Sequence, residues 1–314
     1  LSRRLYKKRT YNRTYETMDT FIQITDFILF LCFSLFTIYL GIPAVAASLK
    51  NAMRYPKTGK KHRFAILFPT DTPFSFSPDY PEELYKVFTY EDLTETVGTL
   101  DEKDFDAVII LGKTTWIEPA FLNEINKAFD GGARAIQLHP ITENRSTRKQ
   151  YFQALNEEIN HSFFRKGAIR LGVSSALCGT DMVLDLAWLK KNQKSRKSNL
   201  ERRLVRQGIF VEYLETVKVY SNDIRIPQYK VRFSKALPAL PEAMLTAHWD
   251  YCNKIFRWVL PSWRTGLTAI FFIAILLLCY NWTLSLKWWA LLYVLIFIVC
   301  LAIPDYLVGQ KTKK

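Results

Sequence analysis

Hydrophobic and polar residues follow two kinds of pattern along this chain. Long uncharged apolar stretches lie toward its two ends, at 27–49, 265–286 and 288–304. Each is long enough to cross a bilayer, although the last is near the lower limit of about 17 residues. Between the first and second, short apolar runs rich in β-branched residues alternate with helical periodicities, which is typical of an α/β domain. The pattern therefore predicts three transmembrane helices and one globular α/β domain.

The clearest part of that domain is a strand, a helix and a second strand. Residues 105–111 form an apolar run, as expected of a strand buried on both faces of a parallel sheet. Residues 118–129 place their large apolar side chains on one helical face, and two glycines can end this helix before a second strand at 133–138. The loop Gly112-Lys113-Thr114 follows the first strand, where open α/β sheets bind ligands.

Several stretches of this region resemble the bacterial membrane-bound family-two glycosyltransferases, the group that includes processive polysaccharide synthases. The resemblance runs from Asp79 to Pro261, and its short sequence motifs occur in the same order as in the family. The most similar stretches are 118–129, 164–177 and 200–215. It implies a GT-A fold: a Rossmann-like, mostly parallel sheet that binds a nucleotide sugar.

The catalytic groups of that family are absent from the matching positions. Its enzymes hold a divalent cation on the sugar-nucleotide diphosphate with an Asp-x-Asp loop, because hard cations prefer oxygen ligands. This chain has Gly112, Lys113 and Thr114 there. The family's general base is an Asp shortly before the stretch that begins at Leu200, where this chain has Ser195 to Asn199. The resemblance therefore implies a scaffold without metal ligands or base.

Other departures affect the nucleotide and acceptor sides. The family's acidic turn after the first strand is replaced by Thr70 to Phe74. Only residues 91–104 separate the strands expected at Tyr85–Tyr90 and at 105–111, between which the family has a helix, another strand and a phosphate loop. Its Gln-x-x-Arg-Trp signature is represented by Gln228 to Phe233, with the arginine displaced and no tryptophan. Asp92 matches the family's base-recognising Asp.

We assign no catalytic, cofactor-binding or metal-binding residue and no cofactor. Lys113 and Lys197 are interpreted as solvated loop lysines rather than replacement catalysts. Cys178 and Asp181, near the position of the family's acceptor pocket, are interpreted as packing residues. The histidines lack metal-ligand spacing; they are His62, His139, His161 and His248.

Charge adds a membrane-surface preference. Lys and Arg total 43 against 29 Asp and Glu, which gives a net charge of +14. One cluster comprises Lys190, Lys191, Lys194, Arg196, Lys197, Arg202, Arg203 and Arg206. Such patches attract polyanions, and beside a bilayer the favoured polyanion is anionic lipid. No aromatic residues interleave this cluster, so no nucleic acid is expected.

Basic residues also predict the topology. They follow the first apolar stretch and the last one, which places the domain and the C-terminus in the cytoplasm. The N-terminus then lies outside, although residues 3–13 are strongly basic. A physiological start at Met18 would remove this conflict, and a re-entrant first segment is the alternative.

The predicted organisation has six parts. They are a basic N-terminal segment 1–26, transmembrane helix 27–49, a GT-A-like domain 50–240, an interfacial amphipathic helix 241–263, a transmembrane hairpin 265–304 and a basic tail 305–314.

We predict a catalytically inactive glycosyltransferase-like subunit of a bacterial inner-membrane complex, with a structural or regulatory role. Its partners would be membrane lipid and a protein that binds near Trp249 to Trp263, an active glycan synthase being one candidate. One alternative is an active metal-independent glycosyltransferase of envelope polysaccharide synthesis that uses Lys113 to offset phosphate charge. An acidic side chain that converges on the acceptor pocket, Asp181 being the candidate, would favour this alternative. A second is a membrane adaptor for an anionic partner.

Overall fold

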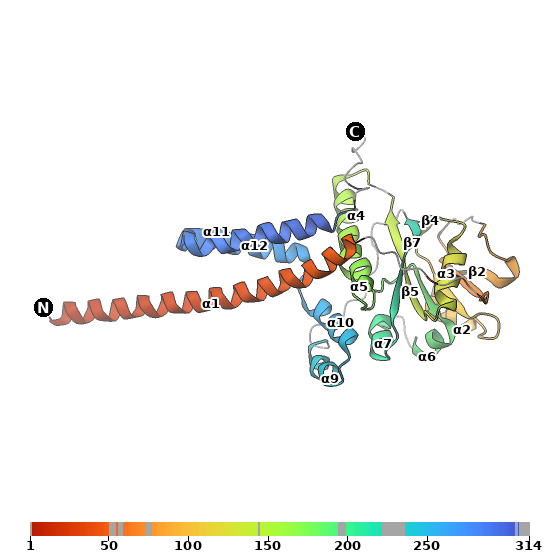
Figure 1. Ribbon diagram of the computed structural model, residues 1–314, viewed down its shortest axis with the longest axis horizontal. Coiled ribbons are helices and arrows are strands. Elements are labelled where there is room, and N and C mark those ends of the chain that lie inside the picture. Colours follow the sequence, from red (N-terminus) through yellow and green to blue (C-terminus); the bar gives the residue numbers. More distant parts are fainter. Residues whose placement is uncertain are drawn as a thin grey trace. The chain divides into compact units, whose positions relative to one another are not determined.

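The computed structural model describes residues 2–49, 55, 59–72, 77–143, 145–193, 199–221, 236–304 and 307, with side chains from residue 18 onward. The chain divides into two compact units. One unit contains Leu1–Ile42 and Pro261–Cys300, and the other contains Pro43–Leu260 and Leu301–Lys314. Figure 1 shows the first as long helices and the second as a sheet flanked by helices.

The first unit is helical. It contains most of α1 (Ser2–Ser48), together with α11 (Trp263–Tyr280) and α12 (Trp282–Leu301). In these helices three segments are long and apolar enough to cross a membrane: Met18–Ser48, Trp263–Tyr280 and Trp282–Leu301. This agrees with the three apolar stretches in the sequence, whereas the membrane orientation stays a prediction.

The turn between α11 and α12 is short. It consists of Asn281, whose side chain accepts a hydrogen bond from the Thr283 amide at 3.0 Å. In the sequence, Lys287 separates the apolar stretches 265–286 and 288–304. Lys287 is helical and pairs with the buried carboxylate of Asp26 in α1, which also accepts a 2.7 Å hydrogen bond from the Trp288 indole.

Close packing joins α1 to both helices of the hairpin. A β-carbon on Gly266 would overlap the ring of Phe36, and one on Gly41 would press against Ile298. Glycine therefore permits the close approach at both contacts, as small residues do between membrane helices.

The second unit is built on one seven-stranded sheet, with strand order β2-β1-β3-β6-β5-β7-β4. The strands are β1 (Phe64–Pro69), β2 (Tyr85–Tyr90), β3 (Ala107–Ile110), β4 (Thr114–Ile117), β5 (Ala135–Thr142), β6 (Met182–Asp185) and β7 (Val211–Ser221). The pairs β1–β2, β1–β3 and β5–β7 are parallel, whereas β3–β6, β5–β6 and β4–β7 are antiparallel.

The sheet is thus mixed, and the prediction of a mostly parallel sheet is wrong. The reason lies mainly in β6, which is short and almost wholly buried. A buried strand is apolar in either direction, so its residue pattern carries no sign of its orientation. The prediction also missed β4, which begins within the expected loop at 112–114.

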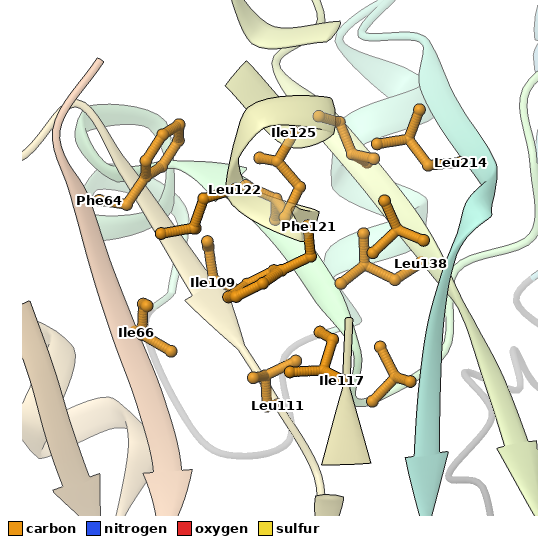
Figure 2. Close-up of a cluster of buried hydrophobic side chains, with 14 of the residues drawn as sticks. Phe64, Ile66, Ile109, Leu111, Ile117, Phe121, Leu122, Ile125, Leu138 and Leu214 are labelled. Carbon is orange, nitrogen blue, oxygen red and sulfur yellow. The ribbon is translucent and has the colours of Figure 1, made fainter. Parts of the chain in front are cut away.

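One face of the sheet packs against α3 (Phe121–Asp130), as Figure 2 shows. Phe121, Leu122 and Ile125 point from this helix onto apolar side chains of the strands. The helix ends at Gly131 and Gly132, and Gly132 has a φ of +99° that a side chain would strain. The predicted two-glycine stop is confirmed, although the helix begins later than the predicted Glu118.

The other face of the sheet is covered by α2 (Leu93–Thr99), α6 (Leu186–Asn192) and α7 (Leu200–Arg206) through a second apolar cluster. The remaining elements are η1 (Glu82–Leu84), α4 (Arg148–His161), the π-helical turn η2 (Ser162–Lys166), α5 (Gly167–Arg170), η3 (Leu237–Ala239), α9 (Leu240–Leu245) and α10 (Trp249–Val259).

The end of α1 belongs to this second unit and is held by α5. The Arg170 guanidinium donates to the carbonyl oxygens of Ala46, at 3.2 Å, and Ala47, at 2.5 Å. It thereby caps a helix end that has no basic residue of its own in its last turn. A β-carbon on Gly167 would overlap the Pro43 carbonyl, so glycine is required for α5 to approach.

Candidate functional site

The candidate site is the edge of the sheet where β3 ends and β6 begins. Leu111 continues β3 into Gly112, and Thr180 and Asp181 lead into β6 beside it. The resemblance places the metal-binding loop of a nucleotide-sugar enzyme at Gly112 to Thr114. The structure brings one predicted acidic residue, Asp181, to this position.

Asp181 closes the Gly112 turn from within. Its Oδ1 accepts a hydrogen bond from the Gly112 amide at 3.1 Å, and its Oδ2 accepts one from the Thr180 hydroxyl at 3.1 Å. The Asp181 side chain is buried, with 4% of the residue exposed. A β-carbon on Gly112 would lie 3.3 Å from the Thr180 hydroxyl oxygen, which leaves little room for a larger side chain. The buried carboxylate therefore holds the loop together.

The backbone and environment of Asp181 are unusual. Its φ is 58°, in the left-handed region that few non-glycine residues adopt. Burial raises the pKa of Asp181 to about 6, although hydrogen bonds from Gly112 and Thr180 oppose the shift. Both features are compatible with a site of stored strain or with a fixed turn.

Neighbouring groups hold this turn from the other side. The Gln137 amide donates to the carbonyl oxygens of Thr180, at 3.3 Å, and Asp181, at 2.8 Å, and its oxygen accepts from the Cys178 amide at 2.6 Å. Burial raises the pKa of the Cys178 thiol to about 12, despite the nearby Arg165. A thiol in this state is a poor nucleophile.

The rest of the predicted metal loop is taken up by the sheet. Lys113 is exposed, and its carbonyl oxygen accepts a 2.6 Å hydrogen bond from the Ser221 hydroxyl. Thr114 begins β4, which pairs with β7. Within residues 91–104, all of which are described, the chain forms α2 and no further strand.

Asp92, the match to the family's base-recognising Asp, has a structural role. It is the N-cap of α2, and its Oδ1 accepts a 2.8 Å hydrogen bond from the Thr94 amide. Such a cap typically contributes about 1 kcal/mol.

Three parts of the predicted site lie wholly or partly outside the described residues. These are the general-base neighbourhood, of which only Asn199 is described, Gln228 to Phe233, and the end of the turn Thr70 to Phe74. Asn199 caps α7 by accepting a 2.9 Å hydrogen bond from the Arg202 amide. The predictions for Lys197 and for the displaced arginine of the signature stay predictions.

The structure contains a buried ionic network that sequence reasoning missed. Glu201 in α7 is fully buried, and its Oε1 lies 3.1 Å from the Lys254 ammonium and 2.8 Å from the Arg257 guanidinium of α10. It also accepts hydrogen bonds from the Leu177 amide at 3.1 Å and the Trp258 indole at 3.3 Å. Burial would raise the pKa of Glu201, but Arg257 and Lys254 lower it to about 2. The available signal was weak: Lys254 lies among the apolar positions of an amphipathic helix, which requires a buried acceptor.

A second polar cluster lies between α4, β5 and β7. His139 is 3.3 Å from Glu158, and His161 Nδ1 is 3.2 Å from the Tyr213 hydroxyl. Burial, Arg165 and His139 hold the pKa of His161 well below its ordinary value. Among the described residues, no three histidine, cysteine or acidic side chains form a group that could hold a metal ion.

The basic cluster predicted near α6 and α7 is partly structural. Lys190 donates to the Leu100 carbonyl at 2.7 Å, and Arg203 donates to the Asn192 carbonyl. Lys191 and Arg206 are exposed. Lys194, Arg196 and Lys197 lie outside the described residues.

Comparisons with known proteins were made by sequence and by structure. No family model matches the chain, and no curated protein matches it in sequence. Twelve solved chains match in structure. One of them is the mannosyltransferase PcManGT from Pyrobaculum calidifontis in complex with GDP-Man and Mn2+, with 10% sequence identity and a TM-score of 0.43 over 88% of this chain and 98% of that one. An overlap of this degree does not establish a shared family.

Proposed function

We propose that this chain is a catalytically inactive glycosyltransferase-like membrane protein that serves as a structural or regulatory subunit of an inner-membrane complex. The observation that carries the proposal is the closed turn at the end of β3. There Gly112 replaces a metal-binding carboxylate, and the nearby Asp181 carboxylate accepts from the Gly112 amide and the Thr180 hydroxyl.

The proposal follows from what nucleotide-sugar transfer requires. In the family that the sequence resembles, a divalent cation neutralises the diphosphate leaving group, and carboxylates hold that cation. Lys113 is exposed and could offset phosphate charge, but an ammonium group cannot bind a cation. Asp181 would have to leave two hydrogen bonds and a buried position to reach a ligand.

The membrane assignment rests on three helices of sufficient length and apolar character. The excess of basic residues after the first and last apolar stretches supports a cytoplasmic domain in a bacterial inner membrane. The partner would be a protein of the same membrane, an active glycan synthase being the leading candidate, together with membrane lipid.

One observation favours the alternative of a metal-independent glycosyltransferase. Asp181, with its pKa raised to about 6, lies where an acid–base group could act. The hydrogen bonds that occupy both of its oxygens favour the structural role. The adaptor alternative is weakened, because the Lys190 and Arg203 side chains of the basic cluster donate to main-chain carbonyls and leave fewer cations for an anionic partner.

The test is to purify the full chain from native membranes in a mild detergent, with Lys113→Ala and Asp181→Asn variants alongside. We expect a partner at constant ratio with the parent chain and with both variants, because neither residue would serve catalysis. Purification of the chain alone, with sugar transfer from a nucleotide sugar that either variant abolishes, would establish the enzyme instead. Partner loss at high salt alone would favour the adaptor.

A further inference from the structure

A row of exposed apolar side chains runs along α9 and α10. Leu245 is 89% exposed and Trp249 is 69% exposed, and Met244 and Phe256 are also exposed. Trp249 and Phe256 lie seven residues apart in α10, which places them on one side of that helix. Together with Leu245 at the end of α9 they form an exposed apolar surface, which we call the stripe.

The opposite side of α10 is fixed to the domain. Tyr251, Cys252 and Ile255 are buried in an apolar cluster with Val205 and Ala243.

Two polar links reinforce that attachment. Asp250 accepts a 2.8 Å hydrogen bond from the Ser174 amide, and Glu201 binds Lys254 and Arg257. These links fix the rotation of α10, so Trp249 and Phe256 face away from the domain. Exposing a large apolar side chain instead of burying it forgoes about 1.5–3 kcal/mol, so several together indicate a surface that is covered in the working protein.

The covalent chain indicates what covers it. Three residues separate the end of α10 at Val259 from the start of α11 at Trp263, and α11 is long and apolar enough to cross a membrane. An extended chain spans at most about 3.6 Å per residue, so the end of α10 lies within roughly 15 Å of the point where α11 begins. The exposed Arg264 follows this link, and an arginine beside aromatic side chains suits the headgroup region.

We propose that α9 and α10 lie along the bilayer surface, with Leu245, Trp249 and Phe256 inserted at the boundary between lipid headgroups and acyl chains. The stripe is then a second membrane attachment that holds the domain by its own surface. This inference rests on the membrane-spanning helices of the proposed function and does not depend on the loss of catalysis. The occupant is the lipid bilayer, and a protein partner at this face is a possible outcome of the test.

The test uses the full chain with Cys32, Cys279 and Cys300 replaced by alanine, since these three cysteines are exposed. A single cysteine is introduced as Leu245→Cys or Trp249→Cys and labelled with an environment-sensitive fluorophore. The labelled chain is reconstituted alone into vesicles of phosphatidylcholine and phosphatidylglycerol. The matched control is Val87→Cys, because Val87 is an exposed apolar residue on β2.

At positions 245 and 249 we expect blue-shifted emission that nitroxide groups on lipid acyl chains quench and aqueous iodide does not. The control position should show the reverse. Iodide quenching at 245 and 249 as strong as at 87 would overturn the proposal, as would protection that develops only after a co-purified protein is added. As a folding control, each labelled variant must unfold at the same temperature as its parent. Because the vesicles contain no partner protein, the result does not depend on whether the proposed membrane complex exists.

Discussion

Removal of the Glu201 carboxylate tests whether the buried ionic network fixes α10 to the domain. In Glu201→Gln the side chain keeps its shape but loses its charge, so the Lys254 ammonium, whose side chain is 2% exposed, keeps the Ser175 carbonyl at 2.5 Å but loses its carboxylate partner. Breaking a buried ion pair from one side typically costs about 3–5 kcal/mol, because the remaining charge has no compensation. For a domain of this size the loss corresponds to a fall in melting temperature of roughly 6–20 °C.

The assay is thermal unfolding of the full chain in detergent, followed by tryptophan fluorescence at one fixed heating rate. Glu242→Gln is the matched control, since Glu242 in α9 is exposed and should melt as the parent does. Lys254→Met should cost less than Glu201→Gln, because Arg257 still neutralises Glu201. The double variant should lose less than the sum of the two single losses, by about 1 kcal/mol or more. A Glu201→Gln loss below about 1 kcal/mol, or strict additivity, would refute this role of the network.

Three further predictions concern other parts of the chain. Burial raises the pKa of Asp181 to about 6, so between about pH 4 and 6 the folded chain binds more protons than the unfolded chain. Its free energy of unfolding should therefore fall by up to about 3 kcal/mol as the pH rises through that window. Asp181→Asn should flatten this slope in melts recorded across the window, and an unchanged slope would show that Asp181 does not cause it. Gly167→Ala should destabilise the chain strongly in the same assay, because the added β-carbon would overlap a main-chain carbonyl of α1. The control Gly98→Ala meets nothing within 4 Å and should raise the free energy of unfolding by about 1 kcal/mol. Equal effects of the two substitutions would contradict the close approach of α5 to α1. Asp26→Lys or Lys287→Asp alone should reduce the amount of monodisperse chain recovered in detergent, and the double exchange should restore part of it; no recovery would indicate that the pair is not a direct link.

Much of the fold is encoded in local patterns that the sequence displays. The apolar run at 105–111 corresponds to β3, strand β2 has the predicted bounds Tyr85–Tyr90, and the two glycines end α3. The direction of a strand, in contrast, cannot be predicted from such patterns. Strand β6 is antiparallel to its neighbours, and its buried residues would form the same apolar pattern in either orientation. It depends on the path of the chain through Thr180 and Asp181, which no periodicity records.

The candidate site was only partly predictable for a related reason. The absence of acidic residues at 112–114 can be read directly from the sequence. The hydrogen bond from the Gly112 amide to Asp181, however, joins residues 69 positions apart. The Glu201 network likewise joins α7 to α10 across more than fifty residues. Long-range polar pairs of this kind leave no local signal beyond a charged residue within an apolar helical face, which Lys254 supplies.

Calorimetric titration of the full chain in detergent with nucleoside diphosphates and their sugars, with and without Mn²⁺ or Mg²⁺, tests the central claim most directly. The closed turn at Gly112 and Asp181 predicts no metal-dependent binding of uridine or guanosine diphosphate sugars. A functional glycosyltransferase titrated under the same conditions provides the positive control. Metal-dependent binding at micromolar affinity that Asp181→Asn abolishes would show that this carboxylate serves a nucleotide site and would contradict the account.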